Sequence, residues 1–383
     1  AIAIVATALV WAAAVIDASR YAPGPDAPVV RPGIVQTNLP QSNKLSWGIE
    51  RSLRDWDRFS ELTVQLAESS PPPDFILWPE TMMPGDTLEA QAMQALREAN
   101  VGYILGGGQM LAPDYFYNEL IALQSAIATP MLVGEDALVD LRVKKLPDGK
   151  IDVEWAARYN SAYLVTDGDV QPVRFDKVRL TPFGETMPFI NRWPWLQDQL
   201  LAFGARGMTF NLSAGTSLTV FEVPCKAAGV TARIVTPICF ETTVNDLCRE
   251  LVFENGRRRA DLIANLTNDG WFMDSDLARA QHLQIAQGWR CVELATPMAR
   301  AANTGISSLI DAQGRIIPPA VIGAPQKARA DGFLNGELAL GTRTTPFARV
   351  GNVFPWTVFG AVVLALAASF LRTRVQPEAA APA

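Results

Sequence analysis

The spacing of apolar residues switches between two periods along most of this chain, and the two periods predict a layered α/β fold. Short apolar runs typical of buried strands occupy residues 34–38, 75–78, 102–105, 230–238, 262–266 and 297–310, the last as one or two strands. Apolar residues three or four apart predict helices over residues 45–68, 88–99, 242–255 and 276–294. Strands that alternate with helices are typical of an α/β domain. Residues 112–156 fit this pattern less well, and we predict a longer excursion there.

Residues 350–371 break the alternation because they contain no charged side chain. The run is long enough for a helix to cross a hydrocarbon core of roughly 30 Å. Arg349 precedes it, Arg372 and Arg374 follow it, and Trp356 lies nearer its start, where an interfacial aromatic residue is expected. We expect a C-terminal transmembrane helix here. The alternative is a buried core helix, but uninterrupted core helices of this length are uncommon.

Residues 1–16 are also apolar apart from Thr7, and Asp17 ends the run. A signal peptide is the competing interpretation, but the basic segment that would begin one is missing. The first residue is alanine, so we expect residues 1–20 to be the end of a transmembrane helix. Its start, and an unknown number of further helices, would lie outside this chain. Residues 21–348 are then one globular domain that both ends attach to a membrane.

Composition excludes several functional classes. The net charge is −6 and the pI is about 5.1, which argues against nucleic acid as a partner. The sequence has no zinc-type spacing, Walker loop or dinucleotide fingerprint, which argues against the zinc, phosphate-binding and dinucleotide sites that those motifs form. Serine-histidine-aspartate catalysis would have to use His282, the one histidine. Four cysteines without a C-x-x-C pair do not indicate a disulfide framework.

Three reactive side chains lie at the ends of predicted elements. Cys239 lies where a strand gives way to a helix, and the N–H groups of the helix should favour its thiolate. Glu80 directly follows the strand at residues 75–78, where α/β folds place ligand clefts. Lys177, followed by Glu185, could stabilise an oxyanion. Each residue alone has an ordinary alternative: a buried apolar cysteine, a solvated carboxylate or a charged surface loop.

Taken together, these residues resemble the Glu-Lys-Cys set of the nitrilase (carbon–nitrogen hydrolase) superfamily. They occur in that order, and the surrounding motifs also match: Val35-Gln-Thr-Asn-Leu-Pro-Gln41, Leu77-Trp-Pro-Glu80, Tyr159-Asn-Ser161, Leu180-Thr-Pro-Phe-Gly-Glu185, Cys239-Phe-Glu241, Asn265-Leu-Thr-Asn-Asp-Gly-Trp-Phe272, Gln281-His282, Arg290-Cys-Val-Glu293 and Arg300-Ala-Ala-Asn-Thr-Gly-Ile-Ser307. Within the superfamily, the chain is most similar to the apolipoprotein N-acyltransferases. The Pro-Phe-Gly-Glu run after the lysine and the two flanking apolar segments favour that branch.

The resemblance implies an α-β-β-α sandwich flanked by transmembrane helices. It implies that Glu80 is the general base, Lys177 the oxyanion stabiliser and Cys239 the nucleophile. Glu185 would orient the lysine or share its proton. Phe240 and Glu241 follow the nucleophile, where the acyltransferases often have Tyr-Glu, so any hydrogen bond from the tyrosine hydroxyl is missing.

The resemblance also implies a reaction and a location. An acyl chain would move from a phospholipid to Cys239 as a thioester, and then to the α-amine of a diacylglyceryl-cysteine lipoprotein, with no cofactor. The enzyme would be a multi-pass protein of the bacterial inner membrane with its catalytic domain on the periplasmic side. A membrane-anchored amidase that hydrolyses small C–N substrates is the main alternative. A non-enzymatic scaffold and a transporter domain have less support.

A lipid substrate predicts apolar side chains near the site. By resemblance, Trp47 lies near the substrate entrance. The segment 189–203 could form a helix whose one face would dip into the membrane interface, and that face carries Trp193, Leu196, Leu200 and Phe203. A helix that packs these side chains on the protein core is an equal alternative. No nucleic-acid partner is expected.

Overall fold

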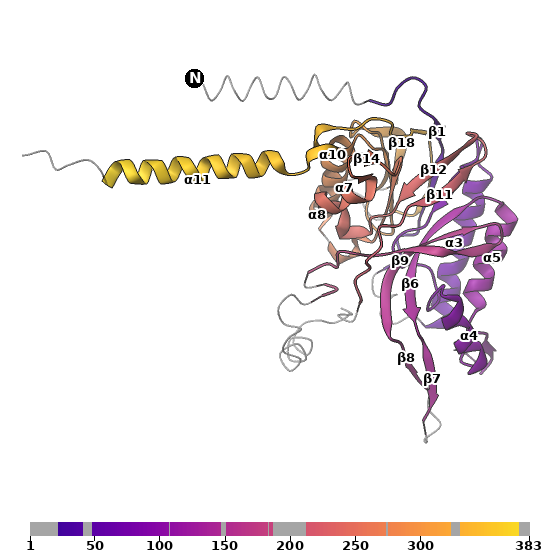
Figure 1. The fold of residues 1–383 in the computed structure, drawn as a ribbon. Helices are drawn as coiled ribbons and strands as arrows, with labels where there is room; N and C mark the ends of the chain where they lie inside the picture. The colour runs from indigo at the N-terminus through magenta and orange to yellow at the C-terminus, as the bar shows by residue number, and fades with distance from the viewer. Residues whose placement is uncertain are drawn as a thin grey trace, which may run out of the picture.

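Two facing β-sheets form the centre of the molecule, and helices cover the outer face of each (Figure 1). The computed structural model describes residues 22–40, 48–106, 108–146, 151–182, 184–186, 212–272, 275–322 and 330–374. Within them, the first sheet has the strand order β10 (Asp169–Asp176), β9 (Ala157–Thr166), β6 (Met131–Val139), β3 (Phe75–Leu77), β2 (Pro32–Gln36) and β19 (Gly332–Asn335). The second has the order β11 (Phe221–Cys225), β12 (Val230–Val235), β15 (Leu262–Thr267), β16 (Met298–Ala302), β17 (Ser307–Ile310) and β18 (Ile316–Ile322).

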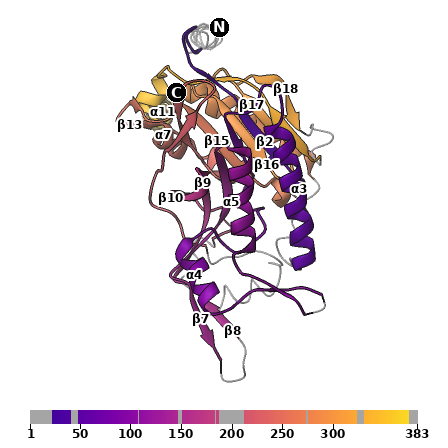
Figure 2. The ribbon, with the colours of Figure 1, turned by 90° about the vertical axis from the view of Figure 1, so that its right-hand side faces the viewer.

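The helices form the two outer layers. Those on the first sheet's side are α3 (Ile49–Ala67), α4 (Ala90–Glu98) and α5 (Tyr115–Ile127). In Figure 2, α3 and α5 run side by side. The second sheet is covered by α7 (Asn245–Val252), α8 (Asp276–Gln284) and α9 (Val292–Leu294), with a π-helical segment Ile285–Cys291 between the last two. The predicted α-β-β-α sandwich is therefore confirmed.

Smaller elements complete the described fold. Four short antiparallel pairs lie outside the large sheets: β1 (Val29–Val30) with β20 (Leu338–Ala339), β4 (Tyr103–Ile104) with β5 (Met110–Leu111), β7 (Arg142–Lys145) with β8 (Ile151–Glu154), and β13 (Phe253–Glu254) with β14 (Arg257–Arg258). Two 3-10 turns follow central strands of the second sheet, η2 (Cys239–Thr243) and η3 (Asp269–Phe272). The C-terminal helices are α10 (Pro346–Val350) and α11 (Val353–Arg374).

The core has one layer between the sheets and another beneath the helices. Leu77, Leu132 and Ile234 are completely buried in the inter-sheet layer. On the outer face, Trp78 packs against Phe59 of α3, with ring centroids 4.5 Å apart, and its indole N–H donates to Thr63 at 3.0 Å. Burying a large apolar side chain contributes roughly 1.5–3 kcal/mol. These contacts fix the end of β3, immediately before Glu80.

Parallel pairing brings the ends of several strands to the same region. β2, β3 and β6 run parallel in the first sheet, and β12, β15 and β16 run parallel in the second. The carboxyl ends of parallel strands lie at one edge of a sheet, where α/β folds bind ligands. Glu80 follows β3, and Cys239 follows β12 through an isolated bridge between Ile238 and Leu266.

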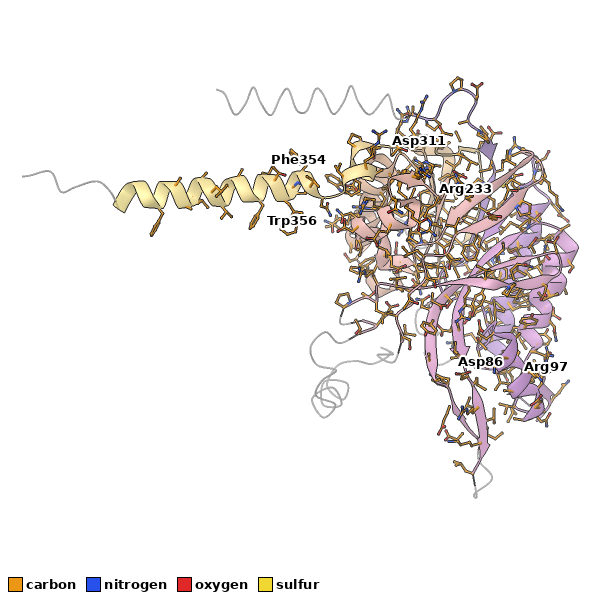
Figure 3. All side chains as sticks on the ribbon, viewed as in Figure 1. Asp86, Arg97, Arg233, Asp311, Phe354 and Trp356 are labelled. Atoms are coloured by element: carbon orange, nitrogen blue, oxygen red, sulfur yellow. The ribbon has the colours of Figure 1, made fainter. Side chains whose placement is uncertain are left out.

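The helix α11 extends away from the body (Figures 1 and 3). Among the described residues, α11 alone is long and apolar enough to cross a membrane, by length and composition. The segment Val353–Phe370 is not buried against the protein, and Phe354 and Trp356 project from the helix near its start (Figure 3). The buried-core alternative for this segment is therefore wrong. The apolar residues 1–16 lie outside the described part of the chain.

Three predictions about elements need correction. Residues 112–156 are not an excursion, because they contain α5 and β6, a central strand of the first sheet. The predicted helix at 242–255 is shorter: a 3-10 turn carries Thr242 and Thr243, and α7 begins only at Asn245 and ends at Val252. The long helix predicted at 276–294 is interrupted by the π-helical segment, a feature found mostly inside longer helices.

Gly134 in β6 offers a test of how tightly the fold holds Glu80. A Cβ atom at Gly134 would lie 2.7 Å from the carbonyl oxygen of Pro79 and 2.9 Å from the Cα of Glu80. We expect Gly134→Ala to displace that backbone and to lower the free energy of unfolding by about 1–3 kcal/mol. Thermal unfolding measures the change. Gly24→Ala is the control, because its nearest neighbour would be an Arg343 side-chain atom at 3.6 Å. Equal melting temperatures for the two variants would contradict the prediction.

Candidate active site

A buried lysine lies between two buried carboxylates. The ammonium of Lys177 is 3.2 Å from Oε1 of Glu80 and 2.8 Å from Oε1 of Glu185, and its side chain is 1% exposed. Burial alone would lower the pKa of Lys177, but Glu80 and Glu185 outweigh it and raise that pKa above its ordinary value. Lys177 in turn holds the pKa of Glu185 below its ordinary value, against the effect of burial. The lysine is therefore charged and fixed in place.

Each oxygen of Glu80 has its own donors. Oε1 accepts from the side-chain amide of Asn160 at 2.7 Å as well as from Lys177. Oε2 accepts from the backbone N–H of Asn268 at 2.9 Å. Asn160 belongs to β9 of the first sheet, whereas Asn268 follows β15 of the second. Glu80 is therefore held from both sheets, and Asn160 also reaches Glu185 at 3.4 Å.

Cys239 lies in a strained turn at the end of β12. Its φ is 50°, in the left-handed region that non-glycine residues rarely adopt. Burial raises the pKa of the Cys239 thiol, and Glu80 raises it further; Lys177 and the nearby Thr267 side chain act in the opposite direction without reversing the shift. The net shift therefore favours the thiol, contrary to the expected thiolate. The resting thiol is neutral, so a base must remove its proton when it reacts.

Glu241 holds the turn that carries Cys239 against the loop that carries Lys177. Its Oε1 accepts from the backbone N–H groups of Val178 and Arg179 at 2.7 and 2.8 Å, and its Oε2 accepts from Ile238 at 2.8 Å. Burial raises the pKa of Glu241 to about 7, although these backbone donors pull it down. Glu241 thus links the residues next to both reactive groups without facing the cavity.

The carboxylates, the lysine and the cysteine share one cavity. Its volume is about 150 Å³, and it is lined by Glu80, Lys177, Thr181, Gly184, Glu185, Cys239, Phe240, Thr243, Asn268, Phe272 and His282. Phe240 contributes an aromatic wall to this cavity. Among the described residues, no group of three or more histidine, cysteine, aspartate or glutamate side chains is placed to hold a metal ion.

The structure thus brings together Glu80, Lys177, Cys239, Glu185 and Phe240 around the cavity, with Glu241 behind it. The predicted lipid contacts Trp47, Trp193, Leu196, Leu200 and Phe203 lie outside the described residues. Sequence reasoning did not assign roles to Asn160, Asn268, Thr267 and Asp269. All four lie in motifs that resemble those of the nitrilase superfamily, and this resemblance was the one feature of the sequence that could have pointed to a role at the site.

The comparisons first define the class of protein. No family model matches the chain. Among solved structures, a mutant of the Nesterenkonia AN1 amidase from the nitrilase superfamily aligns with a TM-score of 0.50 and 13% identity, covering 88% of this chain and 98% of that one. The chain has the fold of the nitrilase superfamily.

Sequence relatives narrow the relationship: the chain is a homologue of the apolipoprotein N-acyltransferases. It is 31% identical over 357 residues to apolipoprotein N-acyltransferase of Rhizobium meliloti (strain 1021), covering 92% of this chain and 56% of the relative. It is 27% identical over 362 residues to the protein of the same name from Geobacter metallireducens, covering 90% and 54%. The chain spans about half the length of the curated relatives it matches.

Removing the lysine charge tests the electrostatic balance of the site. Lys177→Met leaves Glu80 and Glu185 buried without their shared cation, which we expect to cost about 3–5 kcal/mol of unfolding free energy. Adding Glu185→Gln to Lys177→Met removes one of the two carboxylates and should restore part of that loss. Denaturant unfolding of both variants measures this. A double variant less stable than Lys177→Met would contradict the arrangement described here.

The pKa of Glu241 predicts a pH dependence of stability. Because burial raises this pKa from 4.5 to about 7, the folded state retains a proton that the unfolded chain releases. The contribution of Glu241 to stability is therefore fully present below pH 4.5 and is lost as the pH rises through about 7. Between these limits, wild type should lose more unfolding free energy than Glu241→Gln, as followed by thermal unfolding across the range. Parallel pH curves for the two proteins would disprove it.

Proposed function

We propose that this chain carries the catalytic domain of an apolipoprotein N-acyltransferase, with Cys239 as nucleophile, Glu80 as general base and Lys177 as oxyanion stabiliser. The observation that carries the proposal is the buried Lys177 ammonium between Glu80 and Glu185 in the cavity that Cys239 also lines. The homology to named apolipoprotein N-acyltransferases supports the choice of reaction.

In the first half of the proposed reaction, Glu80 takes the proton of the Cys239 thiol as the sulfur attacks the carbonyl carbon of a phospholipid ester. A base is needed because the resting thiol is neutral. The Lys177 ammonium stabilises the negative charge on the carbonyl oxygen. The intermediate then collapses, Glu80 returns the proton to the departing alkoxide, and a lysophospholipid leaves. The acyl chain remains on Cys239 as a thioester.

In the second half, the α-amine of a diacylglyceryl-cysteine lipoprotein attacks the thioester. Glu80 accepts a proton from the attacking amine and returns it to the sulfur as the amide forms. The second carboxylate, Glu185, binds Lys177 from the other side, so the ammonium has a partner even when Glu80 is protonated. Each half therefore starts and ends with Glu80 ionised.

The location of the enzyme follows from the same proposal. The exposed apolar helix α11 would cross the bacterial inner membrane, and the catalytic domain would lie on the periplasmic side, with further membrane helices in the whole protein. Residues 1–20 would be the end of one of them. The phospholipid and the lipoprotein would both reach the cavity from the bilayer.

A membrane-anchored amidase is the second candidate. Two observations favour it: the fold matches that of an amidase, and a cavity of about 150 Å³ suits a small amide. The two candidates share the same three residues and differ in the acceptor, which is water for the amidase and an amine for the acyltransferase.

Mass spectrometry of the intact chain tests the proposed function. After incubation with a chain-labelled phospholipid, we expect an added acyl mass that hydroxylamine removes, because thioesters react readily with it. Cys239→Ser should lose this hydroxylamine-sensitive adduct. Cys225→Ser, at a buried cysteine in β11, is the matched control and should keep it. Transfer of the label to the amine of a diacylated lipopeptide would support the acyltransferase. Turnover of small amides, with no lipid adduct on the folded chain, would support the amidase instead.

A further inference from the structure

A second buried polar cluster borders the cavity through one of its members and has no part in the proposed chemistry. Asp269 and Arg300 are completely buried, and His282 is 4% exposed. Asp269 Oδ1 is 3.0 Å from Nδ1 of His282, and Asp269 Oδ2 accepts from Arg300 Nη2 at 2.7 Å. His282 also lines the cavity. Burying a charged group costs several kcal/mol per ion before pairing. Apolar side chains would fill the same space without this cost, so the cluster calls for an explanation other than packing.

One arm of the cluster reaches the backbone of Cys239. Nε2 of His282 is 3.3 Å from the hydroxyl oxygen of Thr242, and that hydroxyl donates to the carbonyl oxygen of Cys239 at 3.0 Å. A threonine hydroxyl has one hydrogen. Because the carbonyl oxygen of Cys239 receives it, the Thr242 oxygen is free to accept from His282 when Nε2 carries a proton. The chain of bonds therefore runs from Asp269 through His282 and Thr242 to Cys239.

A second arm reaches the surroundings of the thiol. The hydroxyl of Thr267 donates to Asp269 Oδ1 at 3.2 Å, and the Thr267 side chain is also close enough to the Cys239 thiol to affect its pKa. Asp269 is therefore linked both to a neighbour of the sulfur and to the main chain of the same residue.

A third arm holds the strand end before the turn. Arg300 Nη1 donates to Oδ1 of Asn265 at 2.5 Å, and Nδ2 of Asn265 donates to the carbonyl oxygen of Pro237 at 2.9 Å. Pro237 lies two residues before Cys239 along the chain. The three arms thus meet the backbone on both sides of the strained residue and the surroundings of its thiol.

The need for such support follows from the conformation of Cys239. A non-glycine residue in the left-handed region costs of order 1–3 kcal/mol and persists only where its surroundings impose it. The backbone at Gly305 also packs closely against the cluster. A Cβ atom at Gly305 would lie 2.5 Å from Oδ2 of Asp269, so this close approach requires a glycine.

We propose that Asp269, His282 and Arg300 are positioning residues, which hold Cys239 in its left-handed conformation and keep its thiol beside Glu80. The proposal rests on the proposed function only in taking Cys239 as the nucleophile. It is distinct from a purely stabilising role, because it predicts that the reactivity of one thiol changes while the fold is retained.

Alkylation of Cys239 by iodoacetamide, followed by peptide mass spectrometry, tests this without any acyl substrate. Thr242→Val removes the hydroxyl between His282 and Cys239 with little change in volume. We expect alkylation of Cys239 to slow roughly 10- to 100-fold, since small misplacements of reacting groups have effects of this size. Thr242→Ser keeps the hydroxyl and should stay within about threefold of wild type. His282→Gln, whose amide N–H can reach the Nε2 position, should retain more reactivity than the shorter His282→Asn.

Two controls separate positioning from unfolding. Cys225, Cys248 and Cys291 are buried, so their labelling would report unfolding of a variant. Thr129→Val removes a comparable hydroxyl, which donates to the carbonyl oxygen of Ile127 at 3.2 Å beyond α5, and should leave Cys239 alkylation unchanged. If Thr242→Val and His282→Asn keep their three buried cysteines protected and Cys239 reacts at the wild-type rate, the proposal is overturned.

A double variant shows whether Thr242 and His282 act through one chain of bonds. Residues that act as a unit have strongly non-additive effects. Thr242→Val combined with His282→Asn should therefore react no more slowly than the slower single variant, and a rate reduced by the product of both single effects would overturn the proposal. The same variants assayed for acyl adducts separate the two proposals. If alkylation is slowed in the variants but wild type itself never forms an acyl adduct, the positioning role stands and the acyltransferase proposal is rejected.

Discussion

A charged lysine in a protein interior must be paired, and this requirement organises the structure around Lys177. Removing an ammonium from water costs several kcal/mol, so the carboxylates of Glu80 and Glu185 have to come within hydrogen-bonding distance. Because the two carboxylates lie close together, each needs hydrogen-bond donors besides the lysine. The side chain of Asn160 and the backbone N–H groups of Asn268 and Thr181 supply them. The pairing of a single cation therefore determines where two strand ends and a loop must lie.

The two sheets contribute different parts of the site, and hydrogen bonds between the parts fix their separation. The first sheet supplies Glu80 and Lys177, and the second supplies Cys239. Asn268 crosses from the second sheet to Glu80, and Glu241 crosses from the turn at Cys239 to the backbone after Lys177. With both connections made by buried groups, the sheets cannot slide without leaving polar atoms unsatisfied. The distance between Glu80 and Cys239 is therefore a property of how the sandwich packs.

Much of the fold could be predicted from periodicity, because its parallel strands are continuous apolar runs bounded by turns. The strands near residues 34–38, 75–78 and 262–266 are confirmed for this reason. Residues 131–176 were harder, since β6 carries Glu135 and Asp136 within a buried strand and β10 has a single buried position, Phe175. Such strands show neither a pure apolar run nor a clean alternation. The π-helical segment at Ile285–Cys291 also leaves no signal in spacing, because the apolar residues around it still fit a helix.

The site was predictable as a set of residue types but not as an electrostatic environment. Motif resemblance placed Glu80, Lys177, Cys239, Glu185 and Phe240 together, and the structure brings them to one cavity. The protonation of the thiol could not be predicted, since it depends on burial and on the distance to Glu80, which only the packed sheets define. The role of the Asp269 cluster was hidden for a similar reason. Its members come from three separate elements, and none is unusual in its local sequence.

The attachment of α11 has a consequence for how the enzyme would meet a lipid. Asn352, just before α11, exchanges hydrogen bonds with Asn245 and Asp246 of α7 at 2.9 and 2.8 Å, and α7 follows the turn that carries Cys239. With α11 in a bilayer, the reactive sulfur would stand at a constant height above the membrane surface. A lipid ester would then have to rise out of the bilayer to that height. The enzyme and the lipid would meet by diffusion within the plane of the membrane. Under the proposed function, the rate of acylation would then follow the surface density of the donor lipid, not its concentration in bulk solution.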